Sequence, residues 1–93
     1  MIELNIGIIG DFNPQNPSHK ATNNALQYAA AHLGLKIIIT WLPTPSLTEQ
    51  KELWGLDRFD GLWAAPGSPY ESTEGAILAI KQARLFDKPF IGT

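Results

Sequence analysis

The sequence predicts an α/β fold in which helices pack on both faces of a parallel β-sheet. Four short apolar segments alternate with helical patterns along the 93 residues. The first segments are nearly continuous runs of apolar residues, as expected for strands that are covered on both faces. Glycine, proline and asparagine residues separate the elements and mark turns. This alternation is typical of a parallel sheet with right-handed connections, and we expect the strand order 2-1-3-4.

The first strand is predicted over residues 4–10, and a loop rich in proline and asparagine follows it. Asn16 and Pro17 are typical of a helix N-cap and of the first helical position. This helix should run to residue 33, because Gly34 suits the left-handed conformation that ends a helix. Its apolar residues recur at steps of three and four, and the predicted buried face consists of Ala21, Ala25, Tyr28 or Ala29, and Leu33.

The rest of the chain predicts three more strands and two helices. β-Branched residues fill the centre of the second strand, and prolines end it. The last helix has Ser72, Thr73 and Glu74 in its first turn, which suits a helix N-terminus. The predicted strands cover residues 36–42, 60–65 and 88–93, the predicted helices cover 48–54 and 72–86, and the buried stripe of the last helix consists of Ile77, Ile80 and Ala83.

Composition excludes several classes of protein. Seven basic residues stand against nine acidic ones, the net charge is −2 and the pI is about 5.5, so we expect no nucleic acid as a partner. The sequence contains no cysteine, which excludes a disulfide, a thiolate metal site and a cysteine nucleophile within these residues. No apolar run reaches the roughly 20 residues of a membrane span, and no signal peptide is present. We therefore expect a soluble, cytoplasmic protein that contacts no membrane.

Neither a metal nor an organic cofactor is expected. His19 and His32 lie thirteen positions apart and do not match the spacing of a metal pair. His19, near a helix N-terminus, is expected at the surface. The dinucleotide fingerprint, the phosphate-binding loop and the nucleophile elbow have no match. The three tryptophans are expected in the core or in helix packing rather than around a ligand.

Ligands of open α/β sheets bind beyond the carboxyl ends of the strands, where three loops of this chain should meet. These loops cover residues 11–16, 43–46 and 66–71. Asp11 follows the first strand and is a candidate functional carboxylate. In the third loop, the backbone N–H of Gly67 can face an anion or a developing oxyanion. The alternative is a plain turn, since Pro-Gly sequences mark turns in many contexts.

The second half of the chain resembles the class I glutamine amidotransferases, and among them the glutaminase domain of CTP synthase. Residues 59–68, Phe-Asp-Gly-Leu-Trp-Ala-Ala-Pro-Gly-Ser, resemble the strand and loop that carry an oxyanion hole in that family. Glu-Gly at 74–75 opens a helix with the family's spacing, and residues 88–93, Lys-Pro-Phe-Ile-Gly-Thr, resemble the strand that leads to the nucleophile. With the first two strands included, the resemblance covers essentially the whole chain.

The resemblance implies a flavodoxin-like, three-layer α/β/α fold and the hydrolysis of glutamine to glutamate and ammonia. It also implies that Gly67 supplies a backbone oxyanion-hole donor and that Ser68, Pro69 and Tyr70 line the glutamine pocket. The family's nucleophilic cysteine is expected directly after Thr93, so residues 1–93 are expected to form the N-terminal part of a glutamine amidotransferase-like domain that is inactive alone. An incomplete sheet would favour a homo-oligomer.

A second interpretation stays open at this point. The chain can be a small, non-catalytic flavodoxin-like module, complete at residue 93, that binds a ligand or another protein. The two interpretations differ in whether a cysteine, a histidine and a glutamate follow in the complete protein.

Overall fold

The strands form one parallel sheet. The structure is a computed structural model and describes residues 2–64 and 70–91. Within this part of the chain the strand order is β2-β1-β3-β4 and every pairing is parallel, as predicted. The strand bounds are Glu3–Ile9 for β1, Lys36–Leu42 for β2, Gly61–Ala64 for β3 and Phe90–Ile91 for β4.

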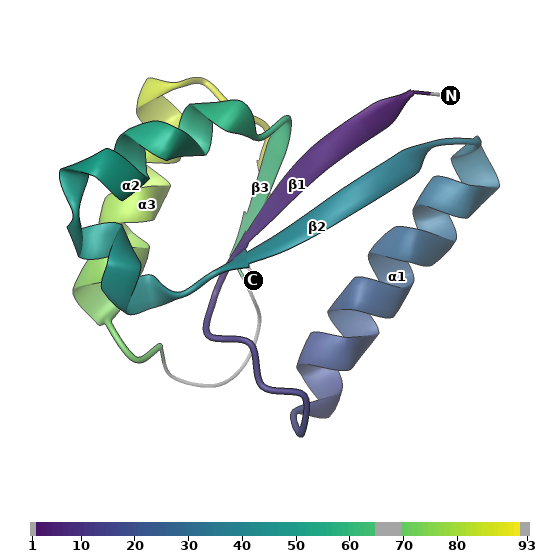
Figure 1. Cartoon of the computed structure of the whole chain (residues 1–93), viewed down its shortest axis with the longest axis horizontal. Helices are drawn as coiled ribbons and strands as arrows, with labels where there is room; N and C mark the ends of the chain where they lie inside the picture. Colours follow the sequence, from purple (N-terminus) through teal and green to yellow (C-terminus); the bar gives the residue numbers. More distant parts are fainter. Residues whose placement is uncertain (1, 65–69, 92–93) are drawn as a thin grey trace.

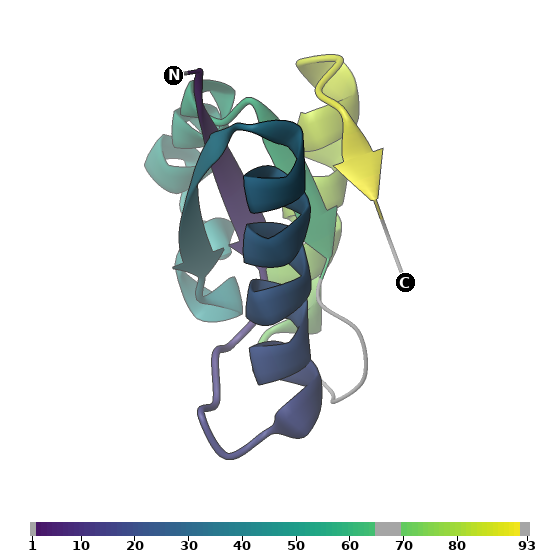
Figure 2. The ribbon, with the colours of Figure 1, turned by 90° about the vertical axis from the view of Figure 1, so that its right-hand side faces the viewer.

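Helices cover both faces of this sheet, which makes the predicted three-layer α/β/α arrangement. Helix α1 (Pro17–Leu33) lies on one face, next to β2 (Figure 1). Helix α3 (Thr73–Leu85) lies on the other face, together with the short helix α2 (Gln50–Trp54). Figure 2 shows α1 in front of the sheet and β4 at its far edge. Among the described residues, no helix is both long enough and apolar enough to cross a membrane.

The predicted helix ends are confirmed in atomic detail. The Asn16 side chain accepts a hydrogen bond from the Ser18 N–H at 2.9 Å, and Pro17 occupies the first helical position of α1. Gly34 ends α1 in the left-handed conformation, with φ of 71°. The Ser72 hydroxyl caps α3 by accepting a hydrogen bond from the Gly75 N–H. Local chemistry therefore fixes where both long helices begin.

The segment between β2 and β3 is less regular than the single helix predicted over residues 48–54. It consists of the 3₁₀ helix η1 (Thr44–Thr48), helix α2 and a second 3₁₀ helix, η2 (Gly55–Arg58). Proline near the start of η1 lacks a backbone N–H, and 3₁₀ turns are frequent as short connectors between regular elements. The apolar side chains of Leu47 and Leu56 still point into the core.

The main core lies between the sheet and the layer that contains α3. Its members come from β1, β2, β3, both 3₁₀ helices and α3, and they are Ile9, Leu42, Leu47, Leu56, Phe59, Leu62, Ala76, Ala79 and Ala83. Only small residues of α3 enter this cluster, so the helix axis lies close to its neighbours. A methyl group on Gly75 would collide with the backbone carbonyl oxygen of Thr44. The close approach of α3 explains why its buried stripe consists of Gly75, Ala76, Ala79 and Ala83.

The predicted stripe of α3 was therefore only partly right. Ala83 is buried and Ile80 is half-buried, but 47% of Ile77 is exposed. The hydrophobicity of isoleucine favoured it in the sequence, whereas the space available beside the sheet favours alanine and glycine.

The predicted apolar face of α1 was wrong. Ala21, Ala25 and Ala29 are exposed, as are Tyr28 and Leu33, which are 77% and 69% exposed. The face that turns toward the protein instead buries His19, Thr22 and Ala30. An alanine-rich helix offers several apolar faces with similar periodicity, and polar residues with partners can be buried among them.

Candidate functional site

The carboxyl ends of β1, β2 and β3 lie side by side, and we call this side of the sheet the ligand edge. Ile9 of β1 is the register partner of both Leu42 of β2 and Ala64 of β3, and each of the three is the last residue of its strand. The three strands therefore end at one level. The loops that follow them start from the same edge of the sheet, where parallel sheets bind ligands (Figure 1).

Asp11 links these three loops through hydrogen bonds. Its Oδ1 atom accepts from the Thr44 backbone N–H at 2.9 Å, and its Oδ2 atom accepts from the Thr44 hydroxyl at 2.7 Å. Oδ2 also accepts from the backbone N–H of Glu71 at 3.0 Å. A carboxylate acceptor makes these hydrogen bonds stronger than bonds between neutral groups. The candidate carboxylate of the first loop thus holds the second and third loops.

Thr44 passes this connection on to helix α3. The residue is fully buried, and its hydroxyl oxygen accepts a hydrogen bond from the Ser72 N–H at 2.8 Å while it donates to Asp11. The Ser72 hydroxyl in turn accepts from the Gly75 N–H at 3.0 Å. Successive hydrogen bonds therefore run from Asp11 through Thr44 and Ser72 to Gly75. They tie the N-terminus of α3 to the loop that follows β1.

Three of the four predicted site residues, Gly67, Ser68 and Pro69, lie outside the described residues. The fourth, Tyr70, is half-buried and packs against the main core cluster. Burial, and secondly the negative charge of Asp11, raise the pKa of the Tyr70 phenol above its ordinary value of 10.0. Tyr70 thus lies within the electrostatic influence of Asp11 and directly precedes Glu71, the residue that Asp11 binds.

An aromatic cluster lies beside this edge and corrects the expected position of His19. The histidine is only 3% exposed, and its ring centroid lies 4.7 Å from that of Trp41. Phe12 completes the cluster at 5.1 Å from Trp41. His19 Nδ1 accepts the backbone N–H of Asn13 at 3.0 Å, so in the neutral ring the proton is assigned to Nε2. This bond makes burial of the ring favourable and holds the loop after β1.

The tryptophans divide between packing and exposure. Trp41 is half-buried, and its indole N–H donates to the Asn23 side-chain oxygen at 2.8 Å. Trp63 is also half-buried, which agrees with a packing role. Trp54 is 64% exposed at the end of α2, so it does not lie in the core, which was one of the two positions predicted for it. Five-residue helix α2 buries none of its residues completely, and its last side chain projects from the protein.

The histidines do not form a metal site. His19 lies in the first turn of α1 and exposed His32 in the last, so thirteen residues of helix separate them, about 20 Å. In the part of the chain that the structure describes, no group of three or more histidine, aspartate or glutamate side chains is arranged to hold a metal ion.

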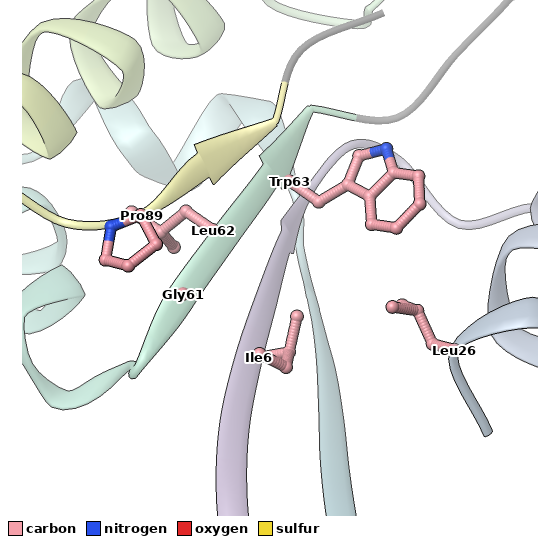
Figure 3. Close-up of a pocket in the computed structure, with 6 residues that line it drawn as sticks. All are labelled: Ile6, Leu26, Gly61, Leu62, Trp63 and Pro89. Carbon is pink, nitrogen blue, oxygen red and sulfur yellow. The ribbon is translucent and has the colours of Figure 1, made fainter. Parts of the chain in front are cut away.

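A separate apolar cavity lies on the α1 face of the sheet. It has a volume of about 160 Å³ and is lined by Ile6, Leu26, Gly61, Leu62, Trp63 and Pro89 (Figure 3). The indole Nε1 atom of Trp63 is buried and has no hydrogen-bond partner among the described residues. Because its lining is apolar, the cavity offers little to orient a polar ligand. The edge organised by Asp11 is the better candidate site.

The sequence had indicated Asp11 but not its partners. Thr44 was missed because it lies between two prolines and reads as part of a loop. The contacts of Asp11 with Thr44 and Glu71 span 33 and 60 positions, so no local pattern reports them.

Comparison with curated proteins finds CTP synthases along nearly the whole chain. The CTP synthase of Sulfurisphaera tokodaii is 33% identical over 91 residues, which are 97% of this chain and 17% of that protein. The Helicobacter pylori enzyme is 33% identical and the Methanococcoides burtonii enzyme 32% identical, each over 90 residues. The chain is thus similar to one segment of these CTP synthases along nearly its whole length. It spans only about one sixth of the length of these relatives. No family model matches the sequence.

A solved structure identifies the fold of the chain. The CTPS glutaminase domain of Trypanosoma brucei, determined with bound acivicin, superimposes with a TM-score of 0.82. The match covers 96% of this chain and 35% of that chain, at 16% sequence identity. The α/β fold of the chain is therefore that of a CTPS glutaminase domain, as the sequence resemblance implied.

Proposed function

We propose that residues 1–93 form the N-terminal part of a class I glutamine amidotransferase-like domain, which in the complete protein hydrolyses glutamine to glutamate and ammonia. The observation that carries this proposal is the structural match to a glutaminase domain over 96% of the chain. The CTP synthases that are 33% identical to it support the same assignment. Since the chain corresponds to about one sixth of these relatives, the proposal does not extend to CTP synthesis itself.

The proposed site residues follow the ligand edge of the sheet. We assign the Gly67 N–H as an oxyanion-hole donor, and Ser68, Pro69 and Tyr70 as the wall of the glutamine pocket. The position of their loop supports this assignment, because it begins after β3 and ends at Glu71, which Asp11 binds. An oxyanion donor acts by meeting the negative charge that develops on the attacked amide oxygen.

The proposed nucleophile lies outside these 93 residues. The 93 residues contain no cysteine, and amide hydrolysis in this class proceeds through attack by a cysteine that a histidine and a glutamate activate. This chain therefore supplies the oxyanion side of the proposed site only. The cytoplasmic location, the homo-oligomer, and the absence of cofactor and nucleic acid stay predictions from the sequence.

The absence of cysteine favours one competing function. A non-catalytic binding module needs no nucleophile, and the same ligand edge can bind a small molecule without reaction. Both an amidotransferase and a binding module can bind glutamine, so binding alone does not distinguish them. The complete gene product must also be assayed for ammonia release, which only the amidotransferase would show.

The proposal is tested by titrating the ¹⁵N-labelled chain with L-glutamine and recording amide chemical shifts. D-Glutamine, which has the same charge and composition, is the matched control. We expect L-glutamine to shift the amides of Tyr70, Glu71 and Ser72 more than those at the opposite end of the sheet, such as Asn5. Equal effects of the two enantiomers, or no shift at the ligand edge, would contradict the proposal.

A further inference from the structure

We propose that Asp11 is a positioning residue for glutamine binding, which holds the end of the pocket-forming loop through the Glu71 N–H and through Thr44. This inference rests on the function proposed above. Asp11 is not assigned a contact with the ligand. Its role is to determine where Tyr70 and Glu71 lie relative to the ends of β1 and β2.

The first support is the number and origin of the donors that Asp11 accepts. Two come from Thr44 after β2 and one from Glu71 before α3, at distances of 2.7–3.0 Å. A carboxylate has about four acceptor positions, so three are already filled by the protein. Little capacity is left for a ligand, whereas the three loops of the ligand edge depend on this one group.

The second support is the rigidity of the element to which Asp11 is tied. Thr44 is fully buried, and its carbonyl group leaves no room for a side chain at Gly75. Ser72 donates to the Thr44 hydroxyl and caps α3. Asp11 and Thr44 therefore hold the end of the loop against a packed helix N-terminus, which is the kind of support that a preorganised site requires.

The third support is electrostatic. The charge of Asp11 contributes, after burial, to the raised pKa of Tyr70, so this carboxylate acts on the predicted pocket residue through space. The effect accompanies the hydrogen bond from the Glu71 N–H to Asp11, because Glu71 directly follows Tyr70 in the chain.

The test compares Asp11→Asn with Asp60→Asn. In Asp11→Asn the remaining side-chain oxygen can still accept the Thr44 N–H. The NH₂ group that replaces Oδ2 is a donor, so it cannot accept the Glu71 N–H and that hydrogen bond is lost. Asp60 is the matched control, because its carboxylate also accepts a backbone N–H, that of Asn5 at 2.7 Å, at the opposite end of the sheet. Circular dichroism and thermal melting show that each variant is folded.

Two readouts are taken on each protein, the hydrogen-exchange rate of the Glu71 and Ser72 amides and the affinity for L-glutamine. We expect Asp11→Asn to accelerate exchange at Glu71 and to weaken L-glutamine binding, each by about tenfold or more. Asp60→Asn should leave both unchanged. Unaltered exchange at Glu71 and Ser72 in Asp11→Asn would overturn the proposal, and so would faster exchange with unchanged glutamine affinity.

A second pair of variants is used if Asp11→Asn does not fold. Thr44→Val removes the hydroxyl that joins Asp11 to Ser72, whereas Thr44→Ser keeps it. We expect faster Ser72 exchange and weaker glutamine binding in the valine variant, with rescue by serine. Equal behaviour of the two variants would overturn the inference. Failure of the proposed function is a different result, since the wild-type chain would then bind no L-glutamine.

Discussion

At the scale of single residues, a carboxylate that follows a strand can bind a ligand or hold the loops around it. The hydrogen bonds of Asp11 favour the second role, because its donors are all groups of the protein itself. His19 acts in a similar way on the loop after β1, to which Asp11 itself belongs, through the Asn13 N–H. Both side chains were visible in the sequence, but the backbone groups that they bind were not.

Gly67 is the residue on which the proposed chemistry depends most. In a complete protein that contains the nucleophile, Gly67→Pro removes the backbone donor and should lower turnover by about 10²–10³ or more. Ser68→Ala, which leaves the backbone donors in place, should reduce it only modestly. Ammonia release from glutamine measures both effects, with circular dichroism as the check on folding. Near-normal release by folded Gly67→Pro would contradict the assignment.

The hydrogen bond of buried His19 should contribute measurably to stability. His19→Phe keeps an aromatic ring between Phe12 and Trp41 but removes the acceptor of the Asn13 N–H. We expect a loss of about 1–3 kcal/mol in the free energy of unfolding, measured by urea denaturation. His32→Phe, at the exposed end of α1, is the control and should change little. Equal stabilities of the two variants would show that the bond contributes nothing.

Tyr70 gives the chain a specific response to alkaline pH. Folding raises the pKa of its phenol above 10.0, so the folded state favours the protonated form. Any stability linked to this group is present below pH 10 and is lost as the pH rises through the higher, folded-state value. In urea denaturation between pH 9 and 12, we expect Tyr70→Phe to lose less stability with rising pH than the wild type does. The exposed Tyr28→Phe variant should follow the wild type.

At the scale of elements, the sequence specified the strands and helix ends better than the buried helix faces. Strand order followed from apolar runs, and capping residues such as Asn16, Gly34 and Ser72 fixed the boundaries. The buried faces of α1 and α3 depend instead on the space beside each helix and on hydrogen bonds such as those of His19 and Thr22, which apolar periodicity does not report. Asp11 could be chosen as a candidate from its place after a strand, but Thr44 could not, because its contact with Asp11 spans 33 positions.

The close approach of α3 to Thr44 predicts an unusual result for a helical glycine. Glycine to alanine normally stabilises a helix by about 1 kcal/mol. Gly75→Ala should instead destabilise the protein by about 1–3 kcal/mol, because the added methyl group meets the Thr44 carbonyl. Gly55→Ala is the control, since its methyl group would meet only the flexible Arg58 side chain. Denaturation curves give the sign, and a more stable Gly75→Ala protein would contradict the structure at this point.

At the scale of the whole molecule, the two faces of the sheet differ in packing. The face toward α3 holds a contiguous cluster of buried residues, whereas the face toward α1 has an apolar cavity between α1 and β3 (Figure 3). The loops of the ligand edge are tied to the well-packed side through Thr44 and Ser72. The better-packed face therefore holds Glu71 and Ser72, whereas the sequence contains no cysteine nucleophile.

The 93-residue chain should consequently release no ammonia from glutamine. Catalysis in this class requires a thiolate, and the sequence has no cysteine. Neither histidine is placed as a base at the ligand edge, because His19 Nδ1 is engaged by Asn13 and His32 lies at the far end of α1. A coupled assay for ammonia, run for hours against a buffer blank, should detect no turnover. Release above the blank that Ser68→Ala abolished would identify a serine nucleophile and would overturn the division of roles proposed here.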